Sequence, residues 1–145
     1  GRGSVKVLGV GELAMGYRRS RIHDEGLTVL SATFALAPGN RAMIHAAMDD
    51  YRRRREEKQP LEMASAGSTF KRPVGHFAGK LIMDAGLRGA RVGGAQVSEK
   101  HCGFVVNTGG ATAADVNALI SRIQEEVRER FGVELEPEVK RIGEF

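Results

Sequence analysis

The stretch from Thr112 to Gly132 predicts one long amphipathic helix, and no other part of the sequence constrains the fold as strongly. Its apolar residues share one helical face: Val116, Leu119, Ile120, Ile123, Val127 and Phe131. Thr112 is a good N-cap with Asp115 in the first turn, and Gly132 is a natural terminator. Because a helix with one apolar face has to bury that face, we expect this helix to pack on a sheet.

Two further patterns predict helices. One begins after Asn40, a residue that can cap a helix, and ends at Gln59-Pro60. We interpret its apolar positions as a core stripe formed by Ile44, Ala47, Met48 and Tyr51. The other helix runs from Phe77 to about Ala85, and its expected buried stripe consists of Ala78, Leu81, Ile82 and Ala85.

Short strands are expected between and around these helices. The segments are residues 5–8, 28–36, 91–98, 104–106 and 133–139. Pro137 indicates that the last segment is an edge strand or contains a bulge, and the pair Gly93-Gly94 suggests a bulge or the close approach of a ligand. Together these elements predict an α+β fold, a two-layer domain with helices packed on a short-stranded, mainly antiparallel sheet.

Composition limits the partners of the chain. The 145 residues carry a net charge of +4, which favours anionic partners. The lone Cys102 excludes an intrachain disulfide and fits a reducing compartment, and no apolar run is long enough to span a bilayer. With 2 Tyr and no Trp, a stacking platform for nucleic acid is not expected. We therefore expect a cytoplasmic protein without a nucleic-acid or membrane partner.

Three local clusters have both a simple and a functional interpretation. The basic run Arg52-Arg53-Arg54-Arg55 is followed at once by Glu56 and Glu57, which favours a solvated helix end. The cluster 16–21 is either a solvated loop or an arginine clamp for a carboxylate or phosphate. His101 beside Cys102 lacks a second pair of ligands, so no metal site is predicted.

The segment Gly67-Ser68-Thr69-Phe70-Lys71-Arg72-Pro73 combines flexibility, a hydroxyl and two cations. Gly67 allows the backbone to approach a ligand closely, and Pro73 favours an extended Arg72. A hydroxyl beside paired cations suits an anionic substrate that also needs a proton. From the residues alone, this segment is either such a site or a surface turn with solvated charges.

Five segments, in order along the chain, resemble motifs of the UDP-N-acetylenolpyruvoylglucosamine reductases, the MurB-type flavoenzymes of peptidoglycan synthesis. They are residues 16–20, 66–73, 77–82, 93–101 and 135–139. The short stretch from Arg52 to Pro60, without a long insertion, resembles the compact subtype of this family. The resemblance covers essentially the whole chain.

The resemblance implies three catalytic residues. They are Arg18 after Gly-Tyr, Ser68 of Gly-Ser-x-Phe-Lys and Glu138 of Glu-Pro-Glu-Val. In the family, FAD reduced by NADPH adds hydride to the enolpyruvyl double bond of UDP-N-acetylglucosamine enolpyruvate, giving UDP-N-acetylmuramate. Arg18 and Glu138 would stabilise the negative charge that builds towards the carboxylate, and Ser68 would donate a proton. Candidate substrate-binding residues are Tyr17, Lys71, Arg72, Lys80, Gln96 and His101.

The family's FAD-binding region, with its glycine-rich pyrophosphate loops, would precede Gly1. The resemblance therefore implies that the chain is a C-terminal portion. We expect residues 1–38 to be the tail of the FAD-binding domain and residues 39–145 to be the substrate-binding domain. Such a portion would be inactive alone. The alternative is a module that binds a UDP-sugar without redox activity.

Overall fold

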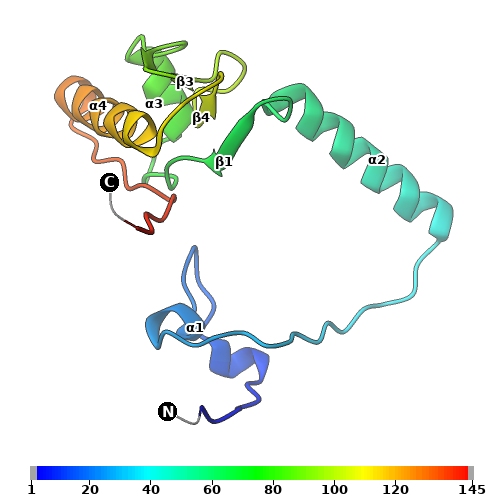
Figure 1. Cartoon of the computed structure of the whole chain (residues 1–145). Coiled ribbons are helices and arrows are strands. Elements are labelled where there is room, and N and C mark those ends of the chain that lie inside the picture. Colours follow the sequence, from blue (N-terminus) through cyan, green and yellow to red (C-terminus); the bar gives the residue numbers. More distant parts are fainter. Residues whose placement is uncertain (1–2, 144–145) are drawn as a thin grey trace. The chain divides into compact units, whose positions relative to one another are not determined.

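A computed structural model of the chain describes residues 3–143. The chain divides into two compact units, with the boundary between Asn40 and Arg41 (Figure 1). None of the described helices is both long and apolar enough to cross a bilayer.

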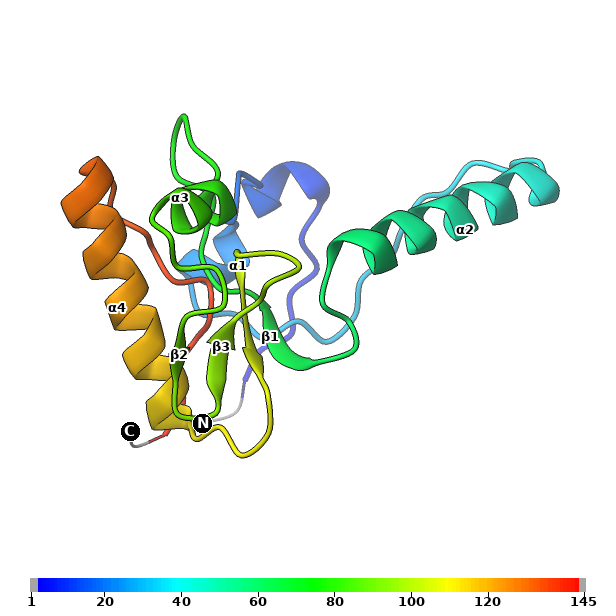
Figure 2. The ribbon, with the colours of Figure 1, turned by 90° about the horizontal axis from the view of Figure 1, so that it is seen from above.

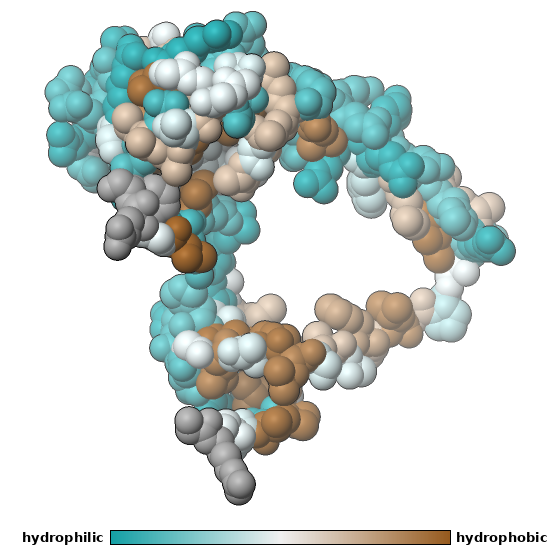
Figure 3. All heavy atoms as spheres, in the orientation of Figure 1, coloured by the Kyte–Doolittle hydropathy of each residue, from teal (hydrophilic) through white to brown (hydrophobic). Residues whose placement is uncertain are grey.

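The first unit has little regular structure. It contains the 3₁₀ helix η1 (Val10–Leu13) and the single-turn helix α1 (Arg21–Asp24). The expected strands 5–8 and 28–36 are wrong, because neither segment pairs with another strand among the described residues. Leu30, Phe34 and Leu36 are 74–87% exposed, and Figure 3 shows hydrophobic residues on the surface of this segment. Alternation alone does not form a strand, since a strand needs a neighbour for its backbone hydrogen bonds.

Helix α2 (Arg41–Lys58) opens the second unit at the expected place. The core stripe predicted for it is wrong, because no residue of the helix is buried. Ile44, Met48 and Tyr51 are between 48% and 69% exposed. The end of the helix is tied to the sheet region by Lys100, whose Nζ donates to the carbonyl oxygen of Glu56 at 2.7 Å. The spacing of the apolar residues was helical, but nothing among the described residues packs on that face.

A four-stranded antiparallel sheet forms the centre of the second unit, in the order β1-β4-β3-β2. Its strands are β1 (Ala64–Ser68), β2 (Arg91–Val92), β3 (Ala95–Val97) and β4 (Phe104–Asn107). Helices α3 (Ala78–Asp84) and α4 (Ala113–Phe131) accompany this sheet, and Figure 2 shows α4 running along it. The α+β prediction is confirmed.

The hydrophobic core lies between the sheet and these two helices. The predicted stripe of α3 is confirmed, with Ile82 fully buried. In α4, Leu119, Ile123 and Val127 are at most 1% exposed, whereas Phe131 at the end of the helix is 39% exposed. Thr112 and Asp115 form the expected capping box, and Gly132 ends the helix in the left-handed region at φ +66°.

Residues 91–98 form a hairpin rather than the single strand that we expected. Gly93 and Gly94 are its turn, because Val92 pairs with Ala95. A Cβ on Gly94 would lie 2.5 Å from the backbone nitrogen of Ala111, so the turn packs directly on the loop before α4. The glycine pair therefore reflects a close approach of the chain to itself.

Candidate active site

Ser68 ends strand β1 at an irregularity in the sheet. Ser65 pairs with Val106 and Ser68 pairs with Phe104, so the register shifts between them. Gly67 supplies the required conformation, with φ at +86°. The Ser68 side chain is exposed, and its hydroxyl donates to the carbonyl oxygen of Phe70 at 3.3 Å. The bulge thus orients the hydroxyl at the edge of the sheet.

A segment near the C-terminus pairs with the residues after Ser68. The N–H of Lys71 donates to the carbonyl oxygen of Glu136, and the N–H of Glu138 donates to that of Thr69, both at 2.9 Å. Phe70 and Pro137 form an isolated antiparallel bridge between them. The expected strand 133–139 is wrong, because only this isolated bridge forms there, but the pairing places the half-buried Glu138 beside the Ser68 motif.

Leu135 anchors this C-terminal segment. Its side chain is 2% exposed and belongs to the core. Its carbonyl oxygen accepts a hydrogen bond of 2.8 Å from the side-chain amide of Gln124 on α4. The position of Glu138 is therefore determined by packing as well as by backbone pairing.

The two cations of the motif have different surroundings. Lys71 forms an ion pair with Glu136. The guanidinium carbon of Arg72 lies 3.9 Å from the centroid of the Phe77 ring, and its Nε donates to the carbonyl oxygen of His76 at 3.3 Å. Phe77 was not among the site residues that we expected from the sequence, because its contact with Arg72 depends on a turn that spacing does not specify.

His101 is oriented by two glycines. The N–H of Gly103 donates to its Nδ1 at 3.0 Å, and the ring meets Phe104 edge-on at 5.1 Å. A Cβ on Gly103 would lie 2.9 Å from Cε1 of His101, and one on Gly79 would lie 3.2 Å from the same atom. Because Nδ1 accepts a hydrogen bond, the neutral ring carries its proton on Nε2, which can then donate to a ligand.

The His101 loop is joined to the Ser68 motif through the backbone. The N–H of Thr69 donates to the carbonyl oxygen of Gly103 at 2.8 Å. Ser68, His101 and Glu138 thus belong to neighbouring stretches of one unit. The sequence motifs had suggested His101, but they did not reveal that its ring packs against Gly79 and Gly103.

Gln96 and Lys80 are engaged elsewhere. Gln96 is 5% exposed, and its amide donates to Gly89 and Glu99 while its Oε1 accepts from Arg91. Lys80 pairs with Asp84 one helical turn away at 2.6 Å, with its side chain largely exposed. These contacts give Gln96 a structural role and leave Lys80 on the solvent face of α3.

Arg18 lies in the first unit, at the tip of a tight turn. Gly16 and Arg19 exchange backbone hydrogen bonds of 2.9 and 3.3 Å, which leaves Tyr17 and Arg18 as the two turn residues. Arg18 has φ +55°, a conformation that is costly for a residue with a side chain and that concentrates at functional sites. Its guanidinium lies 5.7 Å from the centroid of the Tyr17 ring.

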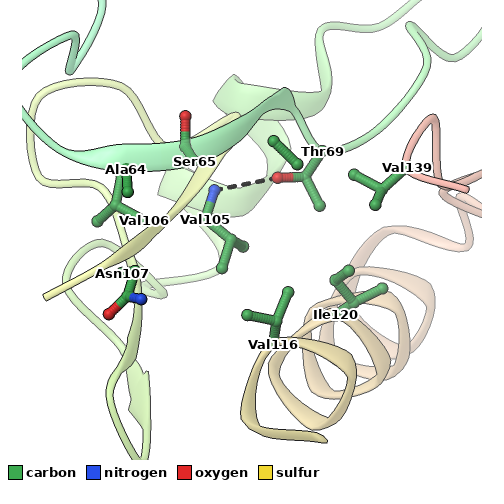
Figure 4. A pocket seen from close by; sticks show the side chains of 10 residues that line it. Ala64, Ser65, Thr69, Val105, Val106, Asn107, Val116, Ile120 and Val139 are labelled. Atoms are coloured by element: carbon green, nitrogen blue, oxygen red, sulfur yellow. Dashed lines mark hydrogen bonds between the residues drawn. The ribbon is translucent and has the colours of Figure 1, made fainter. Parts of the chain in front are cut away.

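An apolar pocket lies between β1, β4, α4 and the C-terminal segment (Figure 4). Its volume is about 360 Å³, and the side chains that line it include those of Val105, Val116, Ile120 and Val139. The Thr69 hydroxyl at its wall accepts a hydrogen bond of 3.0 Å from the N–H of Val105. With this aliphatic lining, the pocket does not suit a phosphate or a flavin diphosphate.

No group of three potential metal ligands exists among residues 3–143. Cys102 is a free, buried thiol, and its burial raises its pKa. These features give the site neither a metal centre nor an activated thiolate.

The fold and the site define a class of protein. The α+β domain places Ser68 on a strand bulge, next to the segment that carries Glu138 and four residues before Arg72. This arrangement is suited to acid-base chemistry on an anionic substrate. Residues 59–142 match the family model of the C-terminal domain of UDP-N-acetylenolpyruvoylglucosamine reductase. The chain belongs to this family.

Individual relatives agree with this assignment. The chain is 61% identical over 143 residues to the UDP-N-acetylenolpyruvoylglucosamine reductase of Agathobacter rectalis, covering 99% of this chain and 46% of that protein. It is 53% identical over 143 residues to that of Staphylococcus carnosus, again covering 99% of this chain and 46% of that protein. The chain thus spans about half the length of the curated relatives it matches.

A crystal structure of UDP-N-acetylenolpyruvylglucosamine reductase (MurB) from Thermus caldophilus has a similar fold. The TM-score is 0.72 at 38% sequence identity, over 88% of this chain and 46% of that one. The fold described above is therefore that of a family with solved members.

Proposed function

We propose that this chain forms the substrate side of the active site of a UDP-N-acetylenolpyruvoylglucosamine reductase, which supplies UDP-N-acetylmuramate for peptidoglycan synthesis. The observation that carries the proposal is the backbone pairing of residues 69–71 with residues 136–138. It joins two family motifs, far apart in the sequence, at one edge of the sheet. Ser68 and Glu138 thereby come from neighbouring stretches.

Ser68 is the proposed proton donor. Reduction of an enolpyruvyl double bond requires a proton on the carbon next to the carboxylate, in addition to a hydride. The hydroxyl of Ser68 is exposed and is held by the Gly67 bulge, and it would exchange its hydrogen bond to the carbonyl oxygen of Phe70 in order to donate that proton. Arg18 and Glu138 are proposed to stabilise the negative charge that develops on the carboxylate.

The anionic parts of the substrate are proposed to contact Tyr17, Arg72 and His101. Arg72 supplies in-plane donors that match a phosphate oxygen pair, and His101 supplies an N–H at Nε2. Lys71 and Lys80 carry carboxylate partners and would have to exchange them to bind the substrate. Gln96 is buried among its own partners, so we do not include it in the binding site.

The cofactors are proposed to be FAD and NADPH, as in the family. The loop Gly109-Gly110 before α4 does not fit a dinucleotide phosphate, because it leads into a capping box in which Thr112 and the negative Asp115 occupy the helix N-terminus. A carboxylate at that position repels a phosphate. We therefore propose that most of the FAD site belongs to the part of a complete reductase that this chain does not span.

We also propose that the protein works in the cytoplasm without nucleic acid. The lone buried thiol of Cys102 suits a reducing compartment. In the basic run of α2, Arg53 and Arg54 both pair with Asp50, at 2.6 and 2.7 Å. Because these arginines carry a carboxylate partner, a solvated helix is a better interpretation than a phosphate-binding stripe.

A second candidate is a module that binds a UDP-sugar without redox activity. It is favoured by the capping box at the N-terminus of α4, which leaves the loop Gly109-Gly110 unsuited to a dinucleotide phosphate. One comparison separates the two functions: this chain alone, and this chain preceded by the upstream half of the A. rectalis reductase. Each is assayed with FAD, NADPH and UDP-N-acetylglucosamine enolpyruvate. The reductase proposal expects substrate-dependent NADPH oxidation by the fusion protein only, with a product two hydrogens heavier. UDP-sugar binding without oxidation by the folded, FAD-loaded fusion protein supports the module.

A further inference from the structure

We infer that Phe77 is a positioning residue, which holds the guanidinium of Arg72 in the orientation that binds an anionic oxygen of the substrate. The inference rests on the proposed function and deepens it. The guanidinium carbon of Arg72 lies 3.9 Å from the centroid of the Phe77 ring. This is a close cation–π contact, well inside the range of about 6 Å over which a ring attracts a cation.

A second contact fixes the same side chain. Nε of Arg72 donates to the carbonyl oxygen of His76 at 3.3 Å. A guanidinium is planar and carries all its N–H groups in that plane. Since the ring occupies a face and His76 occupies Nε, the terminal nitrogens form the edge that can bind a phosphate or carboxylate with two parallel hydrogen bonds.

The local sequence brings these contacts about. The N–H of His76 donates to the carbonyl oxygen of Pro73 at 3.2 Å, and Gly75 has φ +75°, so the chain reverses between Arg72 and Phe77. Phe77 is then the N-cap of α3. Its carbonyl oxygen accepts hydrogen bonds of 3.0 and 3.1 Å from Lys80 and Leu81. The aromatic platform is therefore attached to a helix whose other face is in the core.

The neighbouring cation, Lys71, has different contacts from those of Arg72. Lys71 pairs with Glu136 and joins the C-terminal segment to the motif. No carboxylate forms an ion pair with Arg72 among residues 3–143. The two adjacent cations thus have different roles. Lys71 links the C-terminal segment to the Ser68 motif, whereas Arg72 is oriented to bind a ligand. Fixing Arg72 before binding reduces the entropy that the ligand must overcome.

The test uses the fusion protein described above and two readouts, the kinetic constants for UDP-N-acetylglucosamine enolpyruvate and the Kd for UDP. The variants are Phe77→Leu, Phe77→Tyr, Arg72→Ala and the double variant Phe77→Leu with Arg72→Ala. Val74→Ala is the matched control, because Val74 is in the same turn and is 98% exposed. Phe77 is itself 59% exposed, so its replacement should leave folding intact; circular dichroism verifies this.

We expect Phe77→Leu to raise KM and Kd about threefold to tenfold, the range of a partly exposed cation–π contact, with kcat within about twofold. Phe77→Tyr restores both constants, Val74→Ala changes neither, and the double variant is no worse than Arg72→Ala. Unchanged constants in Phe77→Leu, or additive losses in the double variant, overturn the inference. If the wild-type fusion protein oxidises no NADPH, the proposed function fails, and the UDP titration alone decides the inference. A wild type that also binds no UDP overturns both.

Discussion

The backbone N–H of Glu138 donates a hydrogen bond of 2.9 Å to the carbonyl oxygen of Thr69, the residue that follows Ser68. Together with the bridge between Phe70 and Pro137, this bond makes the C-terminal segment part of the same sheet edge as the serine. The proximity of the segments that carry Ser68 and Glu138 is therefore a product of tertiary structure.

Replacing Leu135 by alanine should loosen the segment that carries Glu138. Leu135 is 2% exposed, and removing a buried leucine costs about 2–5 kcal/mol. We expect the free energy of unfolding in urea to fall by that amount, and reductase activity of the fusion protein to fall with it. Ile142→Ala is the control, because Ile142 is 88% exposed and should change stability by less than about 0.5 kcal/mol. Equal effects of the two substitutions would contradict the anchoring role.

Replacing Gly67 by alanine should strain the bulge that orients Ser68. Gly67 has φ +86°, and a Cβ there would meet no atom within 4 Å, so the effect is purely conformational. The cost of a left-handed conformation is about 1–2 kcal/mol for a residue with a Cβ. We expect lower stability in urea and a lower kcat, while Ala66→Ser at the neighbouring exposed position changes neither. A fully active, fully stable Gly67→Ala protein would show that the bulge is not needed.

Replacing Gly103 by alanine should displace the His101 ring without removing it. The new methyl group would lie 2.9 Å from Cε1 and 3.1 Å from Nδ1 of His101. If the ring donates from Nε2 to the substrate, Gly103→Ala should raise KM about as much as His101→Ala, by roughly twofold to tenfold for one hydrogen bond. The combined variant should be little worse than either alone. A rise in KM for His101→Ala but none for Gly103→Ala would refute the oriented-donor account.

Asp115 should make stability depend on pH in acid. Hydrogen bonds from the Thr112 backbone and side chain, and from the backbone of Gly94, lower the pKa of Asp115 in the folded protein. A depressed folded-state pKa stabilises the protein fully above the unfolded value of about 3.9, and this stabilisation disappears as the pH falls through the lower, folded value. Urea unfolding between roughly pH 2 and pH 6 should therefore show wild type and Asp115→Asn converging at the acid end. A difference that stays constant with pH would contradict this assignment.

The sequence was most informative where local contacts decide the structure. Helix α4 was predicted with its N-cap and its terminator. The hydrogen bonds between Thr112 and Asp115 and the left-handed conformation of Gly132 involve only residues close together in the sequence, so their effect can be predicted from the sequence. The prediction for the stripe of α3 was correct because its residues belong to the hydrophobic core cluster. The α2 stripe and the expected strand 28–36 were wrong, since burial and strand pairing depend on a partner that periodicity does not identify.

The residue types of the candidate site were predictable from the sequence, but the contacts that position these residues were not. Ser68 and Glu138 came from motifs, whereas the pairing that joins them involves Thr69 and Lys71 and became visible only in the structure. The Phe77 platform likewise depends on the reversal of the chain at Gly75. Gln96 was expected to bind the substrate, but its position on a short central strand buries it.

The central claim, that Ser68 delivers the proton, is tested most directly by stopped-flow measurement of the flavin in the fusion protein carrying Ser68→Ala. The account predicts that NADPH reduces the flavin at the wild-type rate, while UDP-N-acetylglucosamine enolpyruvate reoxidises it at least about 10²-fold more slowly, the usual loss for a missing general acid. The folded fraction should be unchanged, because the Ser68 side chain is exposed. Reoxidation of the Ser68→Ala flavin by the substrate at the wild-type rate would contradict the account.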